Sequence, residues 1–115
     1  MQRRRVLKVV AFLLVLVVSS ADVLAQKRIR FQRGKSSATV RGPIGPNGYT
    51  EYVIDGRAGQ VMTIEITSGN GSVVVNAGSA SGKSFSVEMT GGDHLLSVVN
   101  TGRRATNYTL TVSIR

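Results

Sequence analysis

The sequence predicts an all-β protein, a small antiparallel β-sandwich of about eight short strands, on three observations. After residue 25, apolar and polar residues alternate with a period of two, and no helical periodicity is present. Glycine-rich turn sequences separate the alternating segments at short intervals. The 115 residues include no cysteine, so a thin aliphatic core must hold the domain without disulfides. The same strands could also close into a small β-barrel, which is the alternative fold.

Residues 1–25 have the three parts of a cleavable export signal. Three arginines and a lysine lie within residues 3–8, residues 9–18 are all apolar, and residues 23–25 resemble a signal-peptidase site. A membrane span needs roughly 20 apolar residues, about twice the length of this run. We therefore expect cleavage after Ala25, one domain over 26–115 with no membrane span, and a periplasmic or secreted location. The arginines approach a twin-arginine pattern, whereas the apolar run favours the general secretory route.

Turn sequences bound the strands expected in the first half of this domain. The segments at 28–32 and 38–42 precede a turn at 43–48 (PIGPNG), and the segment at 51–55 ends in Asp-Gly. The strand at 62–66 places a methionine and two isoleucines on one face and polar side chains on the other.

The second half of the domain repeats this pattern. Three strands are expected between glycine-rich turns, at residues 72–76, 85–89 and 94–99. The run at 78–84 resembles a phosphate-binding loop, but only three residues separate its glycines and a strand follows, so we interpret it as a hairpin loop. The last strand is expected at 108–114, where tyrosine and aliphatic residues alternate with threonine and serine.

Basic residues are in excess, because residues 26–115 carry eleven lysines and arginines against five acids, a net charge of about +6. A basic cluster stands near the start of the domain: Lys27, Arg28, Arg30, Arg33 and Lys35. The cluster either attracts an anionic partner, such as a cell-wall polymer, lipid headgroups or an acidic cleft, or protects an edge strand from aggregation. Nucleic acid is not an expected partner, since few aromatic residues are interleaved to stack bases.

Catalytic groups are too few and too scattered to predict an enzyme. His94 is the only histidine, so one chain cannot supply a multi-histidine metal site, and we interpret it as a structural residue. Its neighbour Asp93 is poorly placed to orient it, because adjacent strand residues point to opposite faces. The acids form no pair with a glycosidase motif. We therefore expect no catalytic residue, no metal and no cofactor.

Five segments resemble the bacterial periplasmic inhibitors of goose-type (g-type) lysozyme. They are residues 31–38 (FQRGKSSA), 42–44 (GPI), 49–52 (YTEY), 58–60 (AGQ) and 107–114 (NYTLTVSI). The first segment is the most specific. A β-sandwich module found after secreted peptidases shares the Tyr, Ala-Gly-Gln and Tyr-x-Leu-x-Val pattern and is the related interpretation.

The resemblance implies a β-sandwich that blocks the lysozyme cleft with a tyrosine and two arginines from its loops. Tyr49 is the matching tyrosine. The arginine loop of the family, Arg-Asn-x-Ala-Arg, corresponds to residues 100–105 (NTGRRA), where Arg103 and Arg104 are adjacent. A guanidinium can form two charge-assisted hydrogen bonds with a cleft carboxylate. The alternatives are that the arginines are ordinary solvated loop charges and that Tyr49 caps the core.

The leading hypothesis is thus an exported protein that binds and inhibits g-type lysozyme through Tyr49, Arg103 and Arg104. The alternative is a non-inhibitory envelope module that binds an anionic cell-wall carbohydrate or another exported protein. A third, weaker interpretation is a structural domain with no ligand.

Overall fold

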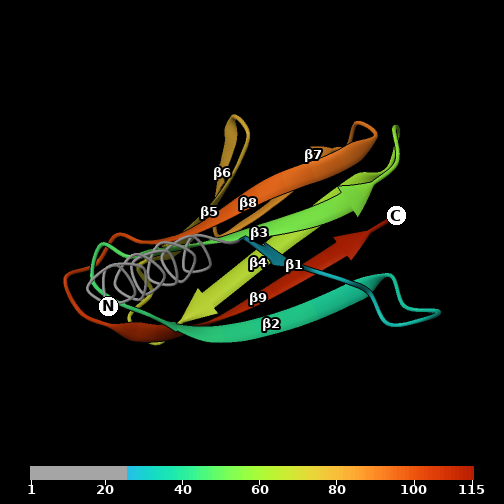
Figure 1. Ribbon diagram of the computed structural model, residues 1–115. Helices are drawn as coiled ribbons and strands as arrows, with labels where there is room; N and C mark the ends of the chain where they lie inside the picture. Colours follow the sequence, from blue (N-terminus) through green and yellow to red (C-terminus); the bar gives the residue numbers. More distant parts are fainter. Residues whose placement is uncertain (1–25) are drawn as a thin grey trace, which may run out of the picture.

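In the computed structural model, residues 26–115 are described and form nine β-strands in two facing sheets (Figure 1). The strands are β1 (Lys27–Arg28), β2 (Ser37–Ile44), β3 (Tyr49–Gly56), β4 (Val61–Ser68), β5 (Val73–Ala77), β6 (Ala80–Gly82), β7 (Ser84–Glu88), β8 (Gly92–Asn100) and β9 (Thr106–Ile114). No helix within 26–115 is long and apolar enough to cross a membrane. The export signal expected at residues 1–25 lies outside the described residues.

The two sheets have the strand orders β1-β3-β8-β5-β6 and β2-β9-β4-β7. Strand pairing is antiparallel throughout, except that β1 runs parallel to β3. The all-β sandwich predicted from the sequence is therefore confirmed, with this parallel pair as the one departure from an antiparallel pattern.

The expected strands all occur, but three boundaries differ in an informative way. The first strand was expected to reach Gln32, yet β1 ends at Arg28, because the chain then leaves this sheet to begin β2 in the other. Pro43 and Ile44 were expected in a turn but complete β2, where Ile44 is buried. The expected hairpin loop at 78–84 contains the short strand β6, which pairs with β5.

The core lies between the sheets and consists mainly of aliphatic side chains from alternate strand positions. On β9, Tyr108, Leu110, Val112 and Ile114 are buried, as the alternation predicted. On the edge strand β7, the inward Phe85 is only half-buried and packs against the margin of the core.

A hydrogen bond between two tyrosines joins the sheets through the core. Tyr52 of β3 and Tyr108 of β9 are 4% and 2% exposed, and their hydroxyl oxygens lie 2.6 Å apart. Gly42 faces Tyr108 across the β2–β9 ladder, and a Cβ atom there would lie 3.1 Å from the Tyr108 hydroxyl. The small residue therefore leaves room for the bonded pair, and each hydroxyl is satisfied by the other instead of by water.

We expect Tyr52→Phe to lower the free energy of unfolding by about 1–3 kcal/mol, because it leaves the buried Tyr108 hydroxyl without a partner. The double variant Tyr52→Phe, Tyr108→Phe should cost less than the sum of the two single variants, since it leaves no orphaned hydroxyl. Urea denaturation of all four proteins measures this coupling. Strict additivity would show that the bond contributes nothing.

The Tyr52–Tyr108 pair also makes the free energy of unfolding decrease at alkaline pH. Burial, reinforced by the hydrogen bond to Tyr108, raises the pKa of the Tyr52 phenol above its usual range. An unfolded tyrosine titrates near pH 10. The stability that the neutral phenol contributes is therefore complete below about pH 10 and is lost as the pH rises toward the higher pKa of the folded state. The urea midpoint should fall above about pH 10, and less steeply in Tyr52→Phe; identical slopes would contradict this.

Candidate protein-binding site

Three loops meet at one end of the sandwich, on the left in Figure 1. They are residues 45–48 between β2 and β3, residues 69–72 between β4 and β5, and residues 101–105 between β8 and β9. The strand register brings them together, because Tyr49 pairs with Val99 at the start of β3. We call these three loops, with Tyr49, the loop end.

Asn100 connects the backbones of this loop end. Apart from the two bonded tyrosines of the core, it is the only buried side chain with a polar group among residues 26–115, at 0% exposure. Its Nδ2 donates to the carbonyl oxygens of Gly45, at 3.0 Å, and Arg104, at 2.8 Å. Its Oδ1 accepts from the Gly102 N–H at 2.9 Å, and its own backbone N–H donates to the Gly48 carbonyl at 3.0 Å.

Thr101 attaches the remaining loop, residues 69–72, to the loop at residues 101–105. The backbone N–H and the Oγ1 of Thr101 both donate to the Ser72 carbonyl, at 2.9 and 2.8 Å. A Cβ atom on Gly102 would lie 3.0 Å from the Ser72 side chain, so the two loops touch closely enough to need glycine there. The three loops are thus fixed to one another and not merely adjacent.

Tyr49, Arg103 and Arg104, which the sequence resemblance singled out, all lie on this loop end. Tyr49 is 66% exposed, so its ring does not cap the core. Both arginines are exposed, and neither forms an ion pair with any residue from 26 to 115. The carbonyl of Arg104 is bound by Asn100 while its side chain stays in solvent.

The charge of the loop end is positive, since residues 45–48, 69–72 and 101–105 contain two arginines and no acid. An exposed ring beside two unpaired guanidinium groups suits a partner with a concave acidic surface. Tyrosine adds contact area with only two rotatable side-chain torsions, so ordering it on binding costs little entropy.

Asn100 is the residue of the loop end that the sequence analysis missed, and its role there is to brace the loops. The last strand before the arginines was expected to end at residue 99, with Asn100 as the first loop residue. Leu96, Val98 and Asn100 share the inward face of β8 and are all buried. Extending the period-two alternation by one step would have indicated that this asparagine points into the core.

The remaining titratable groups of residues 26–115 show no catalytic arrangement. His94 Nε2 lies 2.8 Å from the Thr90 carbonyl oxygen, in agreement with a structural histidine. Asp93 pairs with Arg28 through two contacts of 2.9 Å and does not orient the imidazole. Within the described part of the chain, no three potential metal-ligating side chains come together.

Comparison with solved structures identifies the fold as that of periplasmic inhibitors of g-type lysozyme. PliG of Aeromonas hydrophila superposes with a TM-score of 0.68 at 20% identity, over 79% of this chain and 96% of that one. PliG of Salmonella Typhimurium gives 0.62 at 21%, over 79% and 99%. A mutant PliG of Escherichia coli gives 0.62 at 21%, over 79% and 100%.

The resemblance seen in the sequence is thereby confirmed for the fold. The three proteins are periplasmic inhibitors of g-type lysozyme. No protein-family model and no curated protein sequence matches the chain.

We expect Asn100→Ala to lower the free energy of unfolding by about 2–4 kcal/mol, because two carbonyls and one N–H lose a buried partner. Amide exchange at Gly102 should also accelerate. Asn76→Ala is the matched control, since that exposed side chain bonds only Ser81, and should change stability by less than about 0.5 kcal/mol. Equal effects in the two variants would contradict a bracing role for Asn100.

Proposed function

We propose that this chain is an exported, periplasmic or secreted protein that binds g-type lysozyme and inhibits it. In this proposal Tyr49, Arg103 and Arg104 enter the active-site cleft of the enzyme. The observation that carries the proposal is the braced loop end, which presents one exposed ring and two unpaired arginines on a rigid sandwich.

The chemistry of the partner supports this arrangement. Lysozymes cleave glycan chains with carboxylic acids in a cleft. A guanidinium in that cleft can donate two charge-assisted hydrogen bonds to a carboxylate. The ring of Tyr49 would fill space next to them and keep substrate out. Inhibition then needs no chemical step, only occupation of the cleft.

The bracing by Asn100 supports tight binding through a second effect. Ordering a flexible loop at an interface costs free energy that is subtracted from the affinity. Here the Gly45, Gly102 and Arg104 backbones are already tied to one buried amide. The loop end therefore loses little backbone freedom on binding, and only the side chains of Tyr49, Arg103 and Arg104 must be ordered.

The fold and the sequence resemblance point to the same partner. Three solved structures with this fold are inhibitors of g-type lysozyme. Arg103 and Arg104 are adjacent and lie in the bend of the loop between β8 and β9. We therefore assign the cleft contact to this pair of guanidinium groups and test the two together.

The test is a peptidoglycan-lysis assay of g-type, chicken-type and invertebrate-type lysozymes with the exported protein. We expect selective loss of g-type activity. Arg103→Ala with Arg104→Ala should weaken inhibition roughly a hundredfold, because truncating one partner of a buried charged pair costs about 2–5 kcal/mol. Tyr49→Ala should weaken it roughly tenfold.

The matched control removes two exposed charges elsewhere, Arg57→Ala with Lys83→Ala, and should leave inhibition unchanged. Equal weakening by the control would show that net charge, and not the loop end, determines binding. Full activity of all three lysozymes at large excess of the protein would rule the proposal out.

A further inference from the structure

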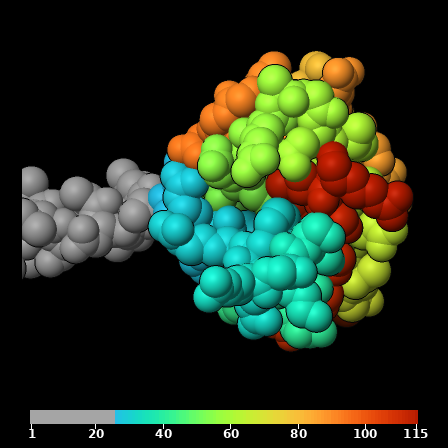
Figure 2. Space-filling model, turned by 90° about the vertical axis from the view of Figure 1, so that its right-hand side faces the viewer, coloured from blue at the N-terminus to red at the C-terminus, as the bar shows by residue number. Residues whose placement is uncertain are grey.

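A second basic surface lies at the end of the sandwich opposite the loop end. Residues 26–41 contain six lysines and arginines and no acid, so more than half of the basic residues of 26–115 fall in this short stretch. The stretch comprises β1, the segment that crosses between the sheets, and the first half of β2. In Figure 2, which views this end, the crossing segment (cyan) lies on the surface.

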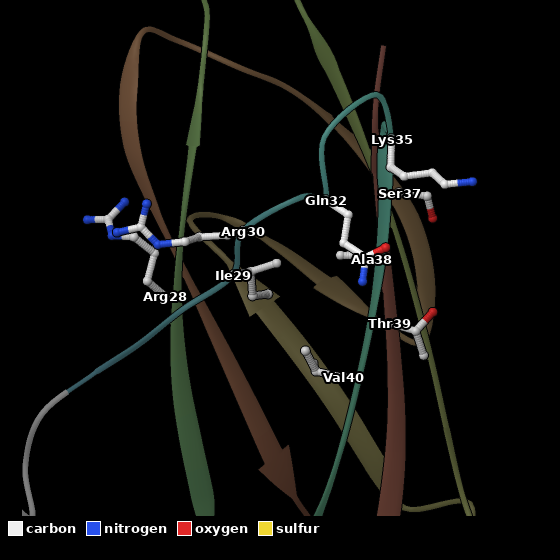
Figure 3. A pocket seen from close by; sticks show the side chains of 9 residues that line it. All are labelled: Arg28, Ile29, Arg30, Gln32, Lys35, Ser37, Ala38, Thr39 and Val40. Carbon is white, nitrogen blue, oxygen red and sulfur yellow. The ribbon is translucent and has the colours of Figure 1, made fainter.

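The crossing segment and β2 enclose a hollow of about 530 Å³ (Figure 3). This volume is within the range of about 300–1,000 Å³ found for small-ligand sites. Ile29 and Val40 contribute apolar side chains to its wall. Hydrogen-bonding side chains complete the lining: Gln32, Ser37 and Thr39.

Positive groups border the hollow on two sides. In Figure 3 the side chains of Arg28 and Arg30 extend outward from the crossing segment, and that of Lys35 extends outward on the far side of β2, so the charges flank the hollow and do not point into it. A single small anion cannot contact both margins across such a hollow. A chain that carries repeated negative charges can.

Most of these charges are available to a ligand. Arg28 is neutralised by its two-point contact with Asp93, and this pairing raises the pKa of Arg28 and lowers that of Asp93. Asp55 lines a neighbouring hollow with Arg30. No ion pair to another residue of 26–115 engages the rest of the basic cluster: Lys27, Arg30, Arg33 and Lys35.

We infer that this hollow and the basic cluster around it bind an anionic glycan, a sugar chain that carries phosphate or carboxylate groups. The guanidinium and ammonium groups pair with the charges. Gln32 in the hollow and Ser37 on the outer face of β2 exchange hydrogen bonds with sugar hydroxyls. A lipid surface fits less well, because the exposed large apolar side chains within 26–115 are Tyr49, Val61 and Leu95, and none lies in the cluster.

The glycan site and the loop end are separate surfaces. The hollow adjoins Ser37 at the start of β2, whereas the first loop of the loop end follows Ile44 at its other end. The hollow reaches along β2 as far as Val40, so the four residues from Val40 to Ile44 separate the two by about 13 Å. Both surfaces can thus be occupied together, and glycan binding does not depend on the lysozyme proposal.

The experiment measures binding of the exported protein to immobilised phosphomannan, to the same polymer after dephosphorylation, and to oligogalacturonate as the carboxylate probe. We expect binding to at least one charged glycan, little to the neutral polymer, and loss of binding at high salt. Binding to only one charged probe identifies phosphate or carboxylate as the group recognised. Binding to neither overturns the inference.

Two variants with the same change in net charge locate the site. Arg30→Gln, Arg33→Gln, Lys35→Gln should weaken glycan binding at least roughly tenfold, because losing one charge-assisted hydrogen bond already has about that effect. Lys83→Gln, Arg103→Gln, Arg104→Gln should retain glycan binding. Equal weakening of glycan binding by both variants overturns the inference. Anionic phospholipid vesicles are a further probe. Binding of the wild-type protein to these vesicles, without binding to either charged glycan, also overturns it.

The lysozyme assay separates the two hypotheses with the same variants. The cluster variant should still inhibit g-type lysozyme, whereas the variant at Arg103 and Arg104 should not. A wild-type protein that binds glycan but leaves lysozyme active contradicts the proposed function alone. All substituted side chains are exposed, so circular dichroism should show an unchanged fold in both variants.

Discussion

A single buried amide, that of Asn100, fixes the geometry of the loop end. A buried amide without partners is costly, so its oxygen and nitrogen must be met wherever the chain places them. Here the partners are backbone groups of Gly45, Gly102 and Arg104, which come from two different loops. The position of the arginines is therefore set from inside the core by β8, and the Thr101–Ser72 hydrogen bonds hold the same loop at the surface.

The opposite end obeys a different constraint, because there the chain must change sheets. Ile29 is buried and its N–H donates to the Val53 carbonyl at 2.8 Å, which anchors the crossing segment at the side of the first sheet. Phe31 packs on the core as the chain crosses. The intervening basic residues are left outside. In the crossing segment, apolar side chains that point into the core alternate with basic side chains that point outward. This alternation concentrates positive charge on one exposed strip.

The sequence predicts the long strands well because their alternation directly reflects burial on one face. It cannot give the end of β1, which is decided by where the chain must reach β2, or the existence of β6, whose small residues carry no pattern. The Arg28–Asp93 pair joins residues 65 positions apart and has no local signal. Tyr49, Arg103 and Arg104 came from a family resemblance, and only the strand register brings them to one end.

The two surfaces together explain a charge distribution that neither explains alone. A net charge of +6 would speed encounter with any acidic partner, but it does not orient the molecule. If both proposals hold, the basic cluster at one end would hold a charged glycan while the bare arginines at the other end face outward. The substrate of lysozyme is itself a glycan of the cell wall. A protein retained on neighbouring anionic glycan meets the enzyme at a raised local concentration, which increases occupancy of the cleft without any further contact.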